Sequence, residues 1–138
     1  MIRRLALAAL LALSPISVMQ AQTPPPQKAA PAPPPEPPPP PYEPQLVQLA
    51  EIMGSLAYLR GLCGAAEAAD WRERMAALLE AEGTTPTRRG RLAGAYNRGL
   101  KGYALTHRRC TAGSREAASR LAVDGERLAR ALAGRFGG

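Results

Sequence analysis

The sequence predicts an all-α protein: a small four-helix bundle in up-down-up-down order, cross-linked by one disulfide and preceded by a disordered proline-rich arm. Three observations favour this fold class. Apolar residues recur at three- and four-residue steps between residues 44 and 136, and no segment shows the two-residue alternation of a strand. The segment 23–44 holds 13 of the 15 prolines, which excludes helix and sheet there. The only two cysteines, Cys63 and Cys110, fall at the ends of the first and third predicted helices.

The first two predicted helices lie within residues 44–64 and 70–83. Gly64 suits the end of the first helix, because glycine readily adopts the left-handed conformation that often follows a helix. Asp70 and Glu73 have the three-residue spacing of a capping box at the start of the second helix. The apolar faces predicted for these two helices comprise Leu46, Leu49, Met53, Leu56, Leu59, Trp71, Met75, Leu78 and Leu79.

The third and fourth predicted helices lie within residues 88–107 and 114–136. Thr85 is expected to cap the third helix, and Pro86 suits its first position, where the missing amide proton costs no helical hydrogen bond. Gly134 is expected to end the fourth helix. Four glycines weaken the third helix by about 1 kcal/mol each relative to alanine, unless they allow close helix packing. These are Gly90, Gly94, Gly99 and Gly102.

The N-terminal residues have the order of a secretory signal peptide. Arg3 and Arg4 form a basic start, an apolar run follows at 5–13, and the small residue Ala21 precedes the expected cleavage site. The apolar run is shorter than the roughly 20 residues of a membrane span, so no stable transmembrane segment is expected after cleavage. We therefore predict three parts: a signal peptide at 1–21, a proline-rich arm at 22–44 and a helical domain at 45–138.

The proline-rich arm is expected to be an extended polyproline II rod or a stiff disordered segment. At about 3.1 Å per residue it reaches on the order of 70 Å, which suits a spacer. Its PxxP-like pattern also suits a ligand for an aromatic groove, so a spacer and a binding motif both stay open. If the signal segment were retained, the arm would tether the bundle to the inner membrane.

Export decides which partners the basic charge suggests. The formal net charge is +7, from 18 basic and 11 acidic residues, and loss of Arg3 and Arg4 lowers it to +5. Outside the inner membrane the accessible polyanions are lipid head groups, cell-wall polymers and surface glycolipids, so no nucleic-acid partner is expected. A positive charge of this size also serves solubility alone. The predicted localisation is the periplasm.

The two cysteines have three interpretations. The up-down-up-down order brings Cys63 and Cys110 to the same end of the bundle, and an oxidising compartment favours a disulfide between them. Closing a loop of this length would stabilise the thin, alanine-rich core by about 4 kcal/mol. His107 lies three residues before Cys110 and leaves a copper or zinc site open, with a carboxylate as a further ligand. A reactive thiol beside His107, Arg108 and Arg109 is the third possibility.

Arg88, Arg89 and Arg91 are the first candidate contact for an anionic partner. They begin the third helix, at the end of the bundle opposite the cysteines. Cations at a helix N-terminus oppose the helix dipole, and this unfavourable placement suggests a role outside the helix. The alternative interpretation is a solvated basic turn.

Arg60, Arg72 and Arg98 form a second candidate patch, for which Trp71 would be a stacking platform. Arg60 and Arg72 lie close to the cysteine end in the sequence. The alternative is that Trp71 belongs to the core and that the arginines pair with nearby carboxylates. Surface pairs of this kind contribute little to stability, so they carry no functional information by themselves.

Three sequence blocks carry a resemblance to a known family. They are LAEIMGSLAYLRGLCG at 49–64, WRERMAALLEAE at 71–82 and AYNRGLKGYALTHRRCT at 95–111. In this order they resemble an uncharacterised family of exported alphaproteobacterial proteins with two well-separated cysteines. The resemblance covers roughly Leu46 to Leu128 and leaves the proline-rich arm outside. It implies a periplasmic address and a Cys63–Cys110 pair, and it implies no activity and no catalytic residue.

No motif for catalysis or cofactor binding is recognisable in the sequence. It contains no glycine-rich phosphate loop, no GxSxG and no HExxH. We therefore predict a non-enzymatic periplasmic helical module, without a cofactor, that binds an envelope protein or an anionic envelope polymer. The alternative hypothesis is a cysteine- or metal-dependent periplasmic protein that uses the end of the bundle containing Cys63, His107 and Cys110.

Overall fold

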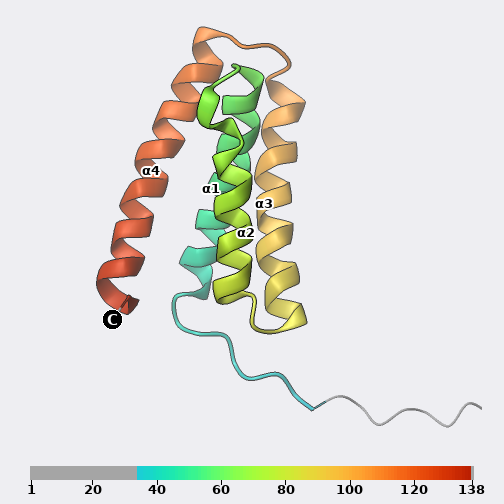
Figure 1. Ribbon diagram of the computed structural model, residues 1–138, viewed down its shortest axis with the longest axis vertical. Coiled ribbons are helices and arrows are strands. Elements are labelled where there is room, and N and C mark those ends of the chain that lie inside the picture. Colours follow the sequence, from blue (N-terminus) through green and yellow to red (C-terminus); the bar gives the residue numbers. More distant parts are fainter. Residues whose placement is uncertain (1–33, 138) are drawn as a thin grey trace, which may run out of the picture. The chain divides into compact units, whose positions relative to one another are not determined.

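The computed structural model describes residues 34–137, and the predicted signal peptide lies outside them. Four α-helices follow one another in up-down-up-down order (Figure 1), as predicted. They are α1 (Glu43–Leu62), α2 (Asp70–Glu82), α3 (Pro86–Thr106) and α4 (Ala112–Phe136), with a 3-10 helix, η1 (Ala66–Ala68), between α1 and α2. The described residues contain no strand. None of their helices is both long and apolar enough to cross a membrane.

Local sequence determines most helix ends. The Thr85 hydroxyl caps α3 by accepting the Arg88 amide at 3.2 Å, and Pro86 is the first residue of that helix. Gly64 follows α1 with a φ of 65°, in the left-handed region that favours glycine. These three predictions are confirmed. α1 begins at Glu43, two residues before the predicted start of the domain.

Two predicted helix ends are wrong. Asp70 is the first residue of α2 and makes no cap hydrogen bond, because η1 already places the preceding Ala69 in a helical conformation. α4 continues through Gly134 as far as Phe136. The Phe136 ring lies 4.9 Å from the Tyr42 ring, and this tertiary contact supports a last turn that the glycine alone would weaken.

α1 is the central helix of the bundle. Its backbone lies close to those of α2, α3 and α4, whereas the backbone of α4 approaches within 8 Å, Cα to Cα, that of α1 but of no other helix of the described residues. α1 and α3 approach closely at two glycines: a Cβ atom on Gly99 would lie 2.0 Å from the Glu51 carbonyl oxygen, and one on Gly54 would lie 1.9 Å from the Tyr96 carbonyl oxygen. Gly102 on the same helix faces open space. Close packing therefore explains Gly99, and it does not explain Gly102.

The core is small and divides into two clusters along α1. One contains Met53 and Met75, and the other contains Ile52 and Leu56. Alanines fill much of the remaining core, and the largest fully buried apolar side chains are Leu56, Leu59 and Leu92. A core of this size leaves a small margin of stability, so a single additional cross-link is a large fraction of the total.

Candidate functional site

The two cysteines form a disulfide at the end of the bundle where α1 and α3 finish. The Cα atoms of Cys63 and Cys110 lie 4.9 Å apart, and the predicted pairing is confirmed. Neither sulfur is a free thiol, so a mechanism that uses Cys110 as a nucleophile would first require reduction of this bond. Among residues 34–137, no three histidine, cysteine or carboxylate side chains gather closely enough to hold a metal ion.

His107 has a structural position at this end. Its backbone follows α3 directly, and its carbonyl oxygen accepts a hydrogen bond from the Tyr58 hydroxyl of α1. Its Nδ1 lies 2.9 Å from the Thr106 hydroxyl, and its ring lies 5.4 Å from the Tyr103 ring. The imidazole forms no ion pair with any carboxylate of the described chain. The Tyr58 hydrogen bond joins the end of α3 to α1, and the ring contacts lie within the last turn of α3.

Three exposed arginines lie within five residues of Cys110. Arg108, Arg109 and Arg115, called here the disulfide-end arginines, form no ion pair with any described residue. The segment 107–115 contains no acidic residue at all. The Arg115 guanidinium donates to the Cys110 sulfur at 3.4 Å, which places this cation beside the cross-link. The result is a local concentration of positive charge without internal compensation.

The backbone that carries these cations is fixed by a reciprocal cap. Thr111 accepts the Ser114 amide at 3.1 Å, and the Thr111 amide donates to the Ser114 hydroxyl at 3.3 Å. The fully buried Ser114 hydroxyl also donates to the Arg109 carbonyl oxygen at 3.1 Å. A shallow hollow of about 290 Å³ lies over this turn, and both Arg108 and Arg109 line it. The loop therefore holds its cations on a defined backbone.

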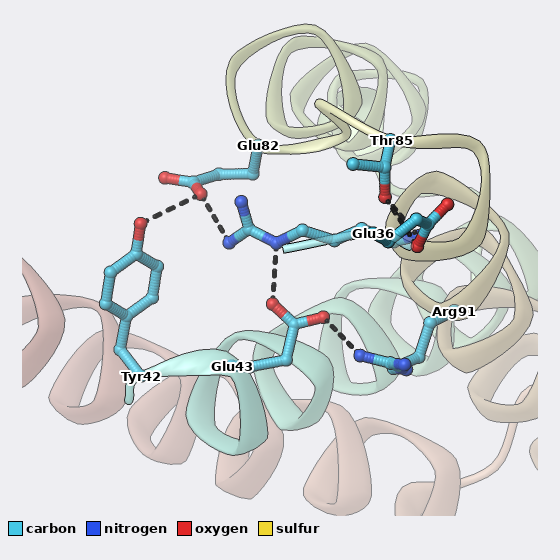
Figure 2. A network of polar contacts seen from close by, with 7 residues as sticks. Glu36, Tyr42, Glu43, Glu82, Thr85 and Arg91 are labelled. Atoms are coloured by element: carbon cyan, nitrogen blue, oxygen red, sulfur yellow. Dashed lines mark hydrogen bonds and ion pairs between the residues drawn. The ribbon is translucent and has the colours of Figure 1, made fainter. Parts of the chain in front are cut away.

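The opposite end of the bundle contains a buried ionic cluster (Figure 2), called here the Arg88 network. Arg88, 9% exposed, donates to Glu43 and to Glu82, each at 2.6 Å. Glu43 is only 4% exposed and also accepts from Arg91 at 3.1 Å. Tyr42 donates to Glu82 at 3.3 Å and completes the network. One arginine thus ties the first turn of α1 to the end of α2 and the start of α3.

The surroundings of Arg88 keep it charged. Burial by itself lowers the pKa of its guanidinium, but contacts with Glu43, Tyr42 and Glu82 outweigh that effect and raise the pKa above its usual value. The start of α3 also holds the end of the proline-rich arm, because the Thr85 hydroxyl donates to Glu36 at 3.3 Å. Arg88 is therefore an internal structural group in this fold.

The other two members of the first candidate group also have carboxylate partners. Arg89 donates to Glu80 at 2.6 Å and to the Leu79 carbonyl oxygen at 3.1 Å, and it stays about half exposed. Arg91 shares Glu43 with Arg88. Contact of these arginines with an anionic partner stays a prediction, and their charges are already largely compensated within the domain.

Two of the three arginines in the second candidate group have carboxylate partners, and their contact with an anionic partner stays a prediction. Arg60 pairs with Glu67 at 3.5 Å and Arg98 pairs with Glu51 at 3.3 Å, each on a different helix. Arg72 is exposed and has no ion-pair partner within residues 34–137.

Trp71 is half-buried and packs against both core clusters, as the alternative interpretation of that residue expected. The guanidinium over its ring belongs to Arg74, at 5.0 Å from the ring centroid. Sequence reasoning had not selected Arg74, although its position one helical turn after Trp71 was visible.

Comparison with known proteins identifies a family. Residues 41–136 match the model of a family described as "Protein of unknown function (DUF2385)". This range includes all four helices and both cysteines of the disulfide. No curated protein and no solved structure matches the chain. The chain therefore belongs to the DUF2385 family, which agrees with the predicted resemblance to an uncharacterised family.

Proposed function

We propose that this DUF2385 protein is an exported, non-enzymatic helical module that contacts an anionic polymer of the cell envelope through the disulfide-end arginines. One observation carries the proposal: three exposed arginines lie around the Cys63–Cys110 bond without a carboxylate partner in the described chain. Cations whose charge is not compensated internally attract polyanions more strongly than cations held in ion pairs. Arg88, Arg89 and Arg91 have carboxylate partners and are therefore not part of the proposed contact.

The rigidity of this end supports the proposal. The disulfide, the Thr111–Ser114 cap and the Tyr58–His107 hydrogen bond fix the backbone on both sides of Arg108 and Arg109. A surface that is ordered before binding loses less conformational entropy on contact. The signal-peptide order of residues 1–21 supports export, and a disulfide is compatible with an oxidising compartment.

The binding test uses polyphosphate of defined length as the anionic probe. We expect the triple variant Arg108→Gln, Arg109→Gln and Arg115→Gln to lose most of the binding and most of its salt dependence. The matched control removes the same charge from the exposed face of α4, through Arg120→Gln, Arg127→Gln and Arg130→Gln. Equal losses in both variants would show that net charge alone drives binding, and this result would reject the proposed surface.

Export is tested separately by the intact mass of the protein from its native envelope fraction. We expect a chain that begins near Gln22 and takes up no alkylating agent until it is reduced. A retained N-terminus would contradict cleavage. Two free thiols in native material would contradict the disulfide-linked module and favour the cysteine-dependent alternative.

A further inference from the structure

The bundle leaves a groove between two helices whose backbones stay apart. α2 and α4 both pack against α1, but no Cα atom of α2 lies within 8 Å of a Cα atom of α4. The α1–α2–α4 groove between them has a volume of about 540 Å³, and Leu49, Ile52, Met53 and Leu56 of α1 line its floor. Sites for small organic molecules have volumes of roughly 300–1,000 Å³ and are mostly apolar. The groove thus has the size and the lining of a small-molecule site.

The two walls of the groove differ in chemistry. α2 contributes Trp71 and Arg74, while α4 contributes the small residues Ala122, Gly125 and Ala129. At Gly125, α4 already approaches α1 closely, because a Cβ atom there would lie 3.0 Å from the Ile52 side chain. Because these α4 residues have small side chains, they fill little of the groove, and the Trp71 indole presents apolar surface from the α2 side.

Arg74 supplies an uncompensated charge at the rim. Two other charged residues line the groove, Glu126 and Arg130, and they pair with each other. Arg74 is exposed, lies over the Trp71 ring and forms no ion pair with any described residue. The complementary ligand therefore has an apolar body and one anionic group.

The length of the groove favours a short occupant. Ile52 and Met53 on the floor are only 8% and 7% exposed and Leu56 is 1% exposed, so an occupant would contact mainly the partly exposed Leu49, Trp71 and Ala122. The floor extends about 10 Å, from the rise of 1.5 Å per residue between Leu49 and Leu56. Two turns of a helix already span this length, whereas an unbranched hydrocarbon chain suits a short apolar groove.

We propose that the α1–α2–α4 groove binds a single-chain amphiphile with a carboxylate head. The chain lies along the floor between Ile52 and the Trp71 indole, and the carboxylate pairs with Arg74. This site is separate from the disulfide-end arginines and does not depend on the function proposed for them.

Trp71 is the only tryptophan of the chain, so its fluorescence reports directly on the groove. We would titrate the full chain with dodecanoate below its micelle concentration, and with dodecyltrimethylammonium and dodecyl maltoside as cationic and neutral ligands of the same chain length. We expect a saturable change with dodecanoate and weaker binding of the other two. An unchanged signal with dodecanoate, or equal binding of the cationic amphiphile, would overturn the proposal and favour a side chain of a partner protein as occupant.

Two pairs of variants locate the site. Arg74→Gln should weaken dodecanoate binding by about two- to fivefold, as expected for an exposed ion pair, while Arg72→Gln on the same helix should have no effect. Ala129→Phe should fill the groove and abolish saturable binding, while Ala131→Phe, exposed on α4 outside the lining, should not. Far-UV circular dichroism checks that each variant is folded. Undiminished binding in folded Arg74→Gln and Ala129→Phe would reject the assignment.

Discussion

Replacing Arg88 by methionine removes the centre of the Arg88 network and keeps a side chain of similar length. The change leaves Glu43, only 4% exposed, with Arg91 as its sole ion-pair partner. Breaking a buried ion pair by removing one partner costs about 3–5 kcal/mol. Glu43 keeps its ion pair with Arg91, whose side chain is 45% exposed, so water near Arg91 can partly compensate the charge of Glu43. We therefore expect the lower end, a loss of about 3 kcal/mol in the free energy of unfolding.

Urea unfolding followed by circular dichroism measures this loss, and an unchanged m-value would show that the unfolded state is comparable. Arg89→Met is the matched control. Arg89 is the next residue of α3, but it pairs at the surface with Glu80, whose side chain is 75% exposed. Its cost should stay below about 1 kcal/mol. Adding Glu43→Gln to Arg88→Met should cost less than the two single losses together, because no unpaired carboxylate stays buried. Equal losses for Arg88→Met and Arg89→Met would refute a buried structural role for Arg88.

Four further changes test other parts of the fold by the same unfolding assay. Reduction of the Cys63–Cys110 bond, which spans a sequence separation of 47 residues, should lower stability by about 4 kcal/mol; an unchanged urea midpoint would contradict this. Gly99→Ala should destabilise by about 1–3 kcal/mol because its methyl group meets the α1 backbone. Gly102→Ala, in open space, should stabilise by up to about 1 kcal/mol, and similar effects at both glycines would contradict the close approach. Thr111→Ala should cost about 1 kcal/mol through loss of the α4 cap, and no loss would mean that the cap contributes nothing.

Local chemistry made much of the fold predictable. Thr85 and Pro86 mark the start of α3 through their own hydroxyl and ring, and Gly64 marks the end of α1 through its positive φ. The apolar spacing gave four helices, and their order then placed Cys63 and Cys110 at one end. Each of these inferences needs only residues close in sequence or the alternation of helix direction.

The parts that escaped prediction depend on contacts between distant residues. Arg88 and Glu43 are 45 positions apart, and nothing near Glu43 in the sequence indicates that its carboxylate becomes buried. Gly134 has the local character of a helix end, but the packing of Phe136 on Tyr42 lets α4 continue. The groove arises where α2 and α4 both pack on α1, and no residue pattern within either helix indicates this arrangement.

Arginines without a carboxylate partner are available to a binding partner, and their removal should affect stability in the opposite direction to the removal of Arg88. Arg115 lies in the first turn of α4, where the helix dipole disfavours a cation, and Arg108 and Arg109 add like charge nearby without a carboxylate. If these residues served the fold, their removal would destabilise it. We expect instead that Arg108→Gln, Arg109→Gln and Arg115→Gln together leave the urea midpoint equal or higher, while removing most of the polyphosphate binding.

A gain in stability with a loss of binding is the pattern of residues kept for an interaction, because such residues are often unfavourable in the isolated domain. The Arg115–Cys110 contact offers the one competing structural role, and Arg115→Gln alone isolates it. A clear loss of stability in that single variant would assign Arg115 to the support of the disulfide, and the anionic contact would then rest on Arg108 and Arg109.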